Sequence, residues 1–375
     1  MQFAYFDTMR HLRLVLTGLL LLGLFQHCRT TKPTPASIPK TALIAQEGFI
    51  TCFEPGLGDG KLWCEASAVV NQQGRIFLAN DKDMPGPRSS VFYFPALTDI
   101  TSSAATRRPA TYLTIPTLQA AHKFEEFAQS PDRRWTFLIT AFDRIKPDTS
   151  EWNGYNTLLA WQPGREGAVQ VVGAEGAGLA SLGLRKQLQA VLGGSPYFKV
   201  EGLAATNTHL YVGVREQGER FDKFDYRITI LSVPYRAGRA ASGDETITLG
   251  AITPVRDFNV DDVDPVLPKP LAISSLEYDP VRHCFWLMTS YEQNGQIGAY
   301  LWTITEAAMA TNGDLQLVRT ADNKPLVFTH KAEDMTFVDA NTLLIIHDDD
   351  RLKTRVGNQE RQPNQAAYSV VRIGL

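Results

Sequence analysis

The sequence lacks most of the motifs that identify a nucleic-acid-binding protein or a common enzyme. Its 37 lysines and arginines are scattered, and the formal net charge is −3, so nucleic acid is not expected as a partner. It contains no Gly-x-Ser-x-Gly turn, His-Glu-x-x-His helix or glycine-rich phosphate loop, and no cysteine stands in a nucleophile pattern. These absences argue against the familiar motif-bearing hydrolases and leave the question of enzymatic activity open.

Long apolar runs are also missing outside the N-terminus. The run from Leu14 to Phe25 follows Arg10 and Arg13, and it has the length of a signal-peptide core rather than that of a membrane span. We therefore predict that residues 1–28 form a secretion signal, that residues 29–41 form a flexible tether, and that the protein is exported.

Cysteine is scarce, with four residues in the chain. Cys28 stands where a bacterial lipoprotein is cut and acylated, so three outcomes stay open: an outer-membrane lipoprotein anchored through Cys28, a soluble periplasmic protein, and an uncleaved membrane anchor. Cys52 and Cys64 flank a turn rich in glycine, and export would allow a disulfide between them. Two buried free thiols are the alternative, and Cys284 is expected to be a small apolar core residue.

The sequence does contain a hairpin that is repeated five times. Each copy opens with an acidic or hydroxyl residue at the start of an apolar strand, turns, and continues as a second apolar strand that ends in an acid. The copies are roughly 60 to 75 residues apart, a regularity that indicates a repeat architecture. Their opening residues are Glu65, Glu125, Glu201, Ser274 and Glu333.

Repeated hairpins of this period are typical of a β-propeller. Two further strands follow most hairpins, while the last repeat is one strand short, and Ala42 to Phe53 can supply that strand beside Ala367 to Ile373. We therefore predict an all-β fold: one domain, residues 42–375, forming a five-bladed β-propeller whose ring is closed by an N-terminal strand in the last blade. Ala180 to Leu192 is predicted to be a helix and Asp257 to Pro270 a surface loop.

Three motifs within these repeats are characteristic: Cys64-Glu65, Glu201-Gly202-Leu203-Ala204-Ala205 and Ser275-Leu276-Glu277-Tyr278-Asp279-Pro280. Through them the chain resembles, from about residue 64 to residue 350, the bacterial family called domain of unknown function 3616. That resemblance implies a propeller and no particular activity, since the family has no assigned function. The order Glu125, Glu201, Ser274, Glu333 is also similar to the axial ligand order of the calcium-activated nucleotidases, which are five-bladed propellers.

The repeat predicts where charged residues gather. In a propeller blade the second strand runs antiparallel to the innermost one, so the start of the first and the end of the second lie at the same mouth of the central channel. The five opening residues, Glu65, Glu125, Glu201, Ser274 and Glu333, are therefore expected to converge on the axis. Further candidates on the rim of that mouth are Asp81, Asp143, Arg215, Glu216, Glu292 and Asp348.

Four carboxylates near one axis stay ionised together only if a cation or hydrogen-bond donors compensate them. Oxygen ligands of this kind suit a hard cation, and we predict that Glu65, Glu125, Glu201, Ser274 and Glu333 hold Ca²⁺. Two alternatives stay open. The glutamates could accept hydrogen bonds from backbone amides and join the blades, or a different strand register could turn the side chains elsewhere.

Two functions are compatible with these observations. The first is an exported binding or scaffold propeller, periplasmic or at the outer membrane, that takes a small-molecule or protein ligand and carries an axial divalent cation. The alternative is a metal-dependent hydrolase of phosphate esters or lactones at the same mouth, with Asp81, Asp143 and Asp348 as candidates for activating water. The fold does not choose between them, because propellers serve both functions.

Overall fold

The computed structural model describes most of the chain after the predicted secretion signal. The residues described are 38–102, 107–146, 150–175, 178, 180–240 and 243–374. The predicted signal, Cys28 and the tether up to residue 37 lie outside them. None of the helices in these ranges is long and apolar enough to cross a membrane.

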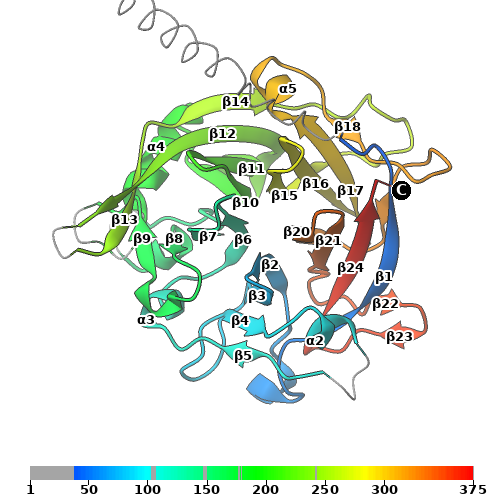
Figure 1. The fold of residues 1–375 in the computed structure, drawn as a ribbon, viewed down its shortest axis with the longest axis horizontal. Helices are drawn as coiled ribbons and strands as arrows, with labels where there is room; N and C mark the ends of the chain where they lie inside the picture. The colour runs from blue at the N-terminus through cyan, green and yellow to red at the C-terminus, as the bar shows by residue number, and fades with distance from the viewer. Residues whose placement is uncertain are drawn as a thin grey trace, which may run out of the picture. The chain divides into compact units, whose positions relative to one another are not determined.

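The short runs rich in Val, Ile, Leu and Phe form strands, as expected for side chains that pack well on a half-buried sheet. They build five antiparallel sheets that are arranged around a central axis as the blades of a propeller (Figure 1). The first blade consists of β2 (Ala66–Gln72), β3 (Arg75–Asn80), β4 (Val91–Phe94) and β5 (Thr111–Tyr112). The second consists of β6 (Phe124–Gln129), β7 (Thr136–Thr140), β8 (Leu158–Trp161) and β9 (Gln170–Val172).

The third and fourth blades each carry a fifth strand that pairs with the third strand of the blade. The third blade consists of β10 (Tyr197–Ala205), β11 (His209–Arg220), β12 (Lys223–Arg239), β13 (Glu245–Leu249) and β14 (Thr253–Asp257). The fourth consists of β15 (Ala272–Asp279), β16 (Cys284–Gln293), β17 (Gln296–Thr305), β18 (Gln316–Leu317) and β19 (Val327–Phe328). No strand lies between β14 and β15, so residues 258–270 form a loop as predicted, while Asp257 ends β14. Most of this loop is exposed, but Phe258, Val260 and Leu267 are buried in the core.

The fifth blade closes the ring. Its strands are β20 (Ala332–Asp339), β21 (Thr342–His347), β24 (Gln365–Ile373) and, from the other end of the chain, β1 (Ala42–Thr51). β1 pairs antiparallel with β24 from Ala42 opposite Ile373 to Thr51 opposite Gln365, and Figure 1 shows the blue strand beside the red one. The predicted closure by an N-terminal strand is thus confirmed.

Helices and the remaining strands lie in the connections. The predicted helix between the second and third blades is α4 (Leu182–Val191). The other short elements are α2 (Thr98–Thr101), α3 (Pro116–Gln119), α5 (Glu306–Ala310), η1 (Leu57–Gly60), η3 (Asn153–Tyr155), η4 (Glu166–Ala168), β22 (Arg355–Val356) and β23 (Gln359–Glu360).

The core consists of five apolar clusters, one between each pair of neighbouring blades. Burying these apolar faces stabilises the folded state by roughly 25 cal/mol for each Å² that is removed from water. The cluster between the fifth and first blades includes Cys52 and Cys64, which form a disulfide with Cα atoms 6.2 Å apart. Cys284 is free and buried between the fourth and fifth blades, as predicted.

Each innermost strand contains, in its N-terminal half, an extra residue that its partner strand does not match, which is a β-bulge. The extra residues are Ser67, Glu125, Glu201, Ser274 and Glu333. The repeat predicted from the sequence is therefore right in four blades and shifted by two residues in the first. In the first blade the equivalent residue is Ser67. Glu65 occupies the position that Lys123 occupies in the second blade.

Candidate functional site

Three glutamates converge at one mouth of the channel. Glu125, Glu201 and Glu333 each place one carboxylate oxygen within 4.8 Å of the others, and each side chain is almost fully buried. Ser274 is the equivalent residue of the fourth blade, and its buried hydroxyl has no hydrogen-bond partner among the described residues. We call Glu125, Glu201, Ser274 and Glu333 the axial ring.

Lysines lie between these carboxylates. The Nζ atom of Lys331 is 2.9 Å from Glu333, while Lys199 contacts Glu201 and lies 3.6 Å from Glu125. Because these ammonium groups are buried, water screens their charge weakly and they interact strongly with the carboxylates of the ring. Each lysine precedes its own glutamate by two residues, in a Lys-x-Glu pattern that includes Lys123, Lys199 and Lys331.

An arginine takes the corresponding place beside the fourth blade, where the position two residues before Ser274 is an alanine. Arg215 is an extra residue on β11, and its guanidinium lies 3.2 Å from Glu201. The same group donates to the carbonyl of Ile273 at 3.0 Å and to the hydroxyl of Ser290 at 2.9 Å. Arg215 was predicted on the rim, and it also joins the third blade to the fourth.

The pKa values of two ring carboxyls diverge. Burial raises the pKa of Glu125 well above its usual value, and the negative charge of Glu201 adds to this effect. Burial also acts to raise the pKa of Glu201, but Arg215 and Lys199 together lower it to about 2. One buried carboxyl thus favours the protonated form while its neighbour stays ionised.

Glu65 belongs to a second group of acids. One oxygen each of Glu65, Asp348 and Asp350 lies within 4.8 Å of the others, and we call these residues the outer acid group. The Nζ atom of Lys82 is 2.5 Å from Glu65, and Arg351 approaches the same carboxylate at 3.7 Å. The five residues predicted to share one ion are therefore divided between two groups.

Most of the rim candidates belong to these two groups, contact them, or interact with a cation that lies beside them. The ammonium of Lys123 is held by Asp143 and lies 3.9 Å from Glu125. The backbone amide of Asp81 donates to the carbonyl of Glu65 at 2.8 Å. Asp348 is part of the outer acid group, and Glu216 lies close enough to Arg215 to contribute to its raised pKa.

Glu292 is the exception among the predicted rim residues. It is exposed and pairs with Ile297 near the end of the hairpin formed by β16 and β17. These are the second and third strands of the fourth blade, and they are longer than the corresponding strands of the first, second and fifth blades. The residue at the end of the hairpin therefore belongs to neither acid group.

Deeper in the channel, Glu126 and Asp334 form a structure that the sequence did not predict. Glu126 accepts hydrogen bonds from the amides of Leu203 and Leu276, both at 2.6 Å. The hydroxyl of Ser275 lies 2.8 Å from Glu126 and 3.3 Å from Asp334. We call Glu126, Ser275 and Asp334 the hub.

Asp334 completes this arrangement. It accepts from the amides of Val69 and Met335 at 2.6 Å and of Phe127 at 3.2 Å. Together the two carboxyls take one backbone amide from the innermost strand of every blade, through Val69, Phe127, Leu203, Leu276 and Met335. The role that the sequence analysis offered as an alternative for the opening glutamates is thus filled by Glu126 and Asp334, the residues that follow Glu125 and Glu333.

Several buried oxygens of the mouth have no hydrogen-bond partner in the described part of the chain. They are Glu125 Oε1, Asp143 Oδ1, Glu201 Oε2, Ser274 Oγ and Glu333 Oε1. Lys331 lies 2.9 Å from Glu333 Oε1 and Arg215 lies 3.2 Å from Glu201 Oε2, so these two oxygens have ionic partners. Within the described residues, Glu125 Oε1 and Ser274 Oγ have no partner that close. Such atoms usually have a partner such as water or a ligand. What fits here is a group that brings positive charge or hydrogen-bond donors.

The chain is similar to known proteins in its fold alone. No family model and no curated protein matches the chain, so the resemblances to the uncharacterised family and to the nucleotidases stay predictions. A PQQ-bound aldose sugar dehydrogenase from Streptomyces coelicolor is similar over 90% of this chain and 100% of its own, with 10% identity and a TM-score of 0.37.

Two further structures are similar to a comparable degree. The catalytic domain of an α-L-arabinofuranosidase from Coprinopsis cinerea covers 90% of this chain and 98% of its own, with 10% identity and a TM-score of 0.42. A DUF4623 family protein from Bacteroides eggerthii covers 91% and 77%, with 7% identity and a TM-score of 0.41. Likenesses at these scores carry no argument about activity.

Proposed function

We propose that this propeller is a binding protein whose axial ring holds a small ligand that carries positive charge or donates hydrogen bonds. The observation that carries the proposal is the set of buried oxygens of Glu125, Glu201, Ser274 and Glu333 without hydrogen-bond donors among the described residues. It is clearest for Glu125 and Ser274, since Glu201 and Glu333 also make ion pairs at 3.2 and 2.9 Å. Leaving a buried acceptor unpaired costs about 1–3 kcal/mol, so several at one place favour an occupant. Ca²⁺ and a polyhydroxylated molecule such as a sugar are the two classes of occupant that match.

Calcium is the first candidate, because every side-chain atom that the ring could offer as a metal ligand is an oxygen. The lysines work against it, since Lys199 and Lys331 already compensate part of the negative charge that the sequence argument assigned to an ion. A divalent ion would have to displace at least one ammonium group from the carboxylates. We therefore propose that calcium binds in competition with Lys199.

This competition gives a direct test. Calorimetric titration of Ca²⁺ into the Lys199→Met variant should show tighter binding than the wild type, by about tenfold or more, because one competing charge is gone. Glu125→Gln should abolish that binding. A matched control is Glu277→Gln, which changes a carboxyl that lines a separate cavity together with Asn71 and Gln129. If neither the wild type nor Lys199→Met binds Ca²⁺, calcium is excluded.

The sugar arm of the proposal is tested on the same proteins. A panel of neutral mono- and disaccharides is titrated into the wild type and into Glu125→Gln. Binding of a sugar that is weakened by Glu125→Gln and kept in Glu277→Gln supports the axial ring as the site. The proposed binding function fails if neither the sugars nor Ca²⁺ binds.

Hydrolysis is the second candidate, and the divergent pKa values of Glu125 and Glu201 favour it specifically. A protonated carboxyl beside an ionised one is the arrangement that acid–base catalysis needs. Turnover of nitrophenyl phosphates or lactones that is lost in Glu125→Gln and Glu201→Gln, and retained in Glu277→Gln, would establish this activity. Turnover that persists in both ring variants would exclude the mouth as its site.

Export completes the proposed function. The basic residues and short apolar run before Cys28 support secretion, and the disulfide between Cys52 and Cys64 is compatible with an oxidising compartment. Mass spectrometry of the mature N-terminus distinguishes a lipid-modified Cys28 from a cut further along the chain. An intact N-terminus would contradict cleavage.

A further inference from the structure

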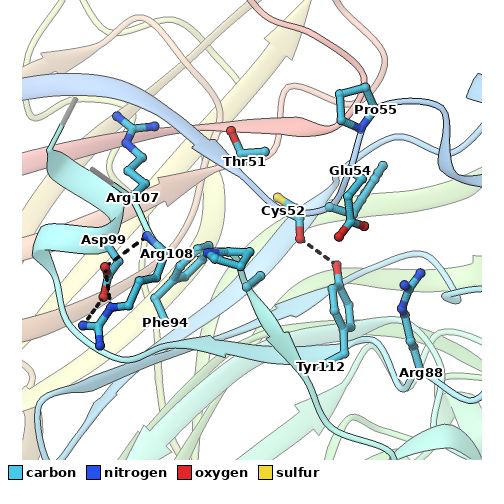
Figure 2. A pocket seen from close by; sticks show the side chains of 13 residues that line it. Thr51, Cys52, Glu54, Pro55, Arg88, Phe94, Asp99, Arg107, Arg108 and Tyr112 are labelled. Atoms are coloured by element: carbon cyan, nitrogen blue, oxygen red, sulfur yellow. Dashed lines mark hydrogen bonds and ion pairs between the residues drawn. The ribbon is translucent and has the colours of Figure 1, made fainter. Parts of the chain in front are cut away.

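A second cavity lies away from the axial ring, beside the seam where the first and fifth blades meet. It has a volume of about 400 Å³ and lies between the segment that follows β1 and the strands β4 and β5. Small-molecule sites usually begin near 300 Å³, so this cavity has the size of a ligand site. Figure 2 shows its walls, with Arg88 and Tyr112 on one side and Arg107, Arg108 and Asp99 on the other.

The inner surface of the cavity is apolar and rigid. Phe53 and Phe94 are buried, and the hydroxyl of Tyr112 donates to the carbonyl of Cys52 at 3.1 Å. Cys52 is in turn fixed by its disulfide to Cys64. A flat apolar body could therefore be received without rearranging the wall, which favours binding.

Two of the three arginines have no carboxylate partner. Arg107 donates to the carbonyls of Ser102 and Phe49 at 2.6 and 2.7 Å, which orient its guanidinium but do not neutralise it. Arg88 is half-buried, with its guanidinium 5.6 Å from the centre of the Tyr112 ring. Within the described ranges, neither arginine has a carboxylate within ion-pair distance.

The remaining charges of the cavity are one closed pair and one exposed acid. Arg108 and Asp99 are joined by two hydrogen bonds, at 2.9 and 2.7 Å, so each satisfies the other. Glu54 is exposed to water and makes no ion pair in the described part of the chain. Two unpaired arginines against one solvated carboxylate leave the cavity with a positive excess.

We propose that this cavity binds a small organic anion, with a carboxylate or sulfonate held by Arg88 and a flat apolar body against Tyr112, while Arg107 on the opposite wall adds positive charge. Guanidinium groups bind such anions through paired, charge-assisted hydrogen bonds. The partly exposed ring of Tyr112 offers contact area to the apolar part. This site is independent of the axial ring, and its occupation does not rest on the binding function proposed above.

The probe for the test is 1-anilinonaphthalene-8-sulfonate, an aromatic sulfonate whose fluorescence rises on binding. The wild type should bind one probe per chain, and benzoate should displace it while benzylammonium does not. Arg88→Gln should weaken binding about tenfold, and Arg88→Lys, which keeps the charge, should weaken it less. Arg236→Gln, an exposed arginine on β12 in the third blade, is the matched control.

Two results would overturn the proposal. One is wild-type affinity for the probe in Arg88→Gln and in Arg107→Gln, since the probe would then bind elsewhere. The other is displacement by benzylammonium as effective as displacement by benzoate, since the site would then have no preference for anions. Glu125→Gln should leave probe binding unchanged, which separates this cavity from the axial ring.

Discussion

Glu125 and Glu126 are neighbours in the chain, as are Glu333 and Asp334, yet the members of each pair have opposite surroundings. In the axial ring, Glu125 and Glu333 face lysines, and each keeps an oxygen without a hydrogen bond to any described residue. In the hub, Glu126 and Asp334 accept five backbone amides. Both layers are buried, so the difference is not one of solvent exposure.

The comparison teaches that the kind of partner decides what a buried acid can do. A lysine side chain can move aside, so the carboxylates of the ring can exchange one partner for another. A backbone amide is fixed by its strand, so the hub can hold the blades in register but has little freedom to bind anything else. We infer that the hub is structural and that the ring is the layer free to function.

The largest expected effect is on stability, from Asp334→Asn. The new amide group would turn a donor toward the amides of Val69 and Phe127, which both use one oxygen of Asp334. We expect a loss of about 3 kcal/mol in the free energy of unfolding, measured with urea. The adjacent change Glu333→Gln should cost less, about 1 kcal/mol, because Glu333 contacts the side chain of Lys331 rather than backbone amides.

If Glu333→Gln proves as damaging as Asp334→Asn, the two layers are not different in kind. The ring would then be part of the framework, and the binding function would lose its physical basis.

The next effect is a dependence on pH that separates the layers. The folded pKa of Glu201, about 2, lies below its unfolded value, so its contribution to stability is present above about pH 4.5 and is lost as the pH falls toward 2. The pKa values of Glu126 and Asp334 are raised, first by burial, so their contribution is present at low pH and is lost as the pH rises.

Urea unfolding at several pH values measures this effect. Glu201→Gln should flatten the acid side of the profile, removing a loss on the order of 2 kcal/mol between pH 4.5 and 2.5. Glu126→Gln should leave the acid side unchanged. An unchanged acid side in Glu201→Gln would mean that Arg215 and Lys199 do not stabilise the ionised carboxylate.

The repeat in the sequence was enough to predict the ring, its closure and four of the five equivalent positions. It could not predict the hub, because period-two alternation places Glu126 on the opposite face from Glu125. The bulge breaks that alternation and turns both toward the channel. The first blade was assigned two residues too early because Glu65 has the same residue type as the other opening residues. The bulge, which the sequence does not reveal, is at Ser67.

Two other signals were present in the sequence but were not used. The Lys-x-Glu pattern, which occurs three times, predicts cations among the carboxylates once the residues two apart are considered together. The Glu201-Gly202-Leu203 motif also has a structural cause. A Cβ atom at Gly202 would lie 2.9 Å from the Cα of Gly213, and the amide of Leu203 is needed by Glu126. Such motifs can therefore reflect how the ring closes rather than an activity.

A smaller effect is expected at Ser67, the ring-equivalent residue of the first blade. Its hydroxyl donates to the carbonyl of Phe124 at 2.5 Å, across the boundary to the second blade. Ser67→Ala should cost about 1 kcal/mol in urea unfolding, the usual net worth of one buried hydrogen bond. Axial ligand binding should be retained, because this hydroxyl is committed to the framework.

The smallest effect on stability is expected at Ser274, which occupies the same register position as Ser67 in the fourth blade. Its buried hydroxyl has no partner in the described part of the chain, so its lost hydrogen bonds to water are not replaced there. Ser274→Ala breaks no hydrogen bond and should change the free energy of unfolding by less than about 0.5 kcal/mol. If the axial ring binds a ligand, the same change should weaken that ligand's affinity in calorimetric titration. A loss of stability comparable to that of Ser67→Ala, with no change in affinity, would place Ser274 in the framework and would leave the fourth blade without a part in binding.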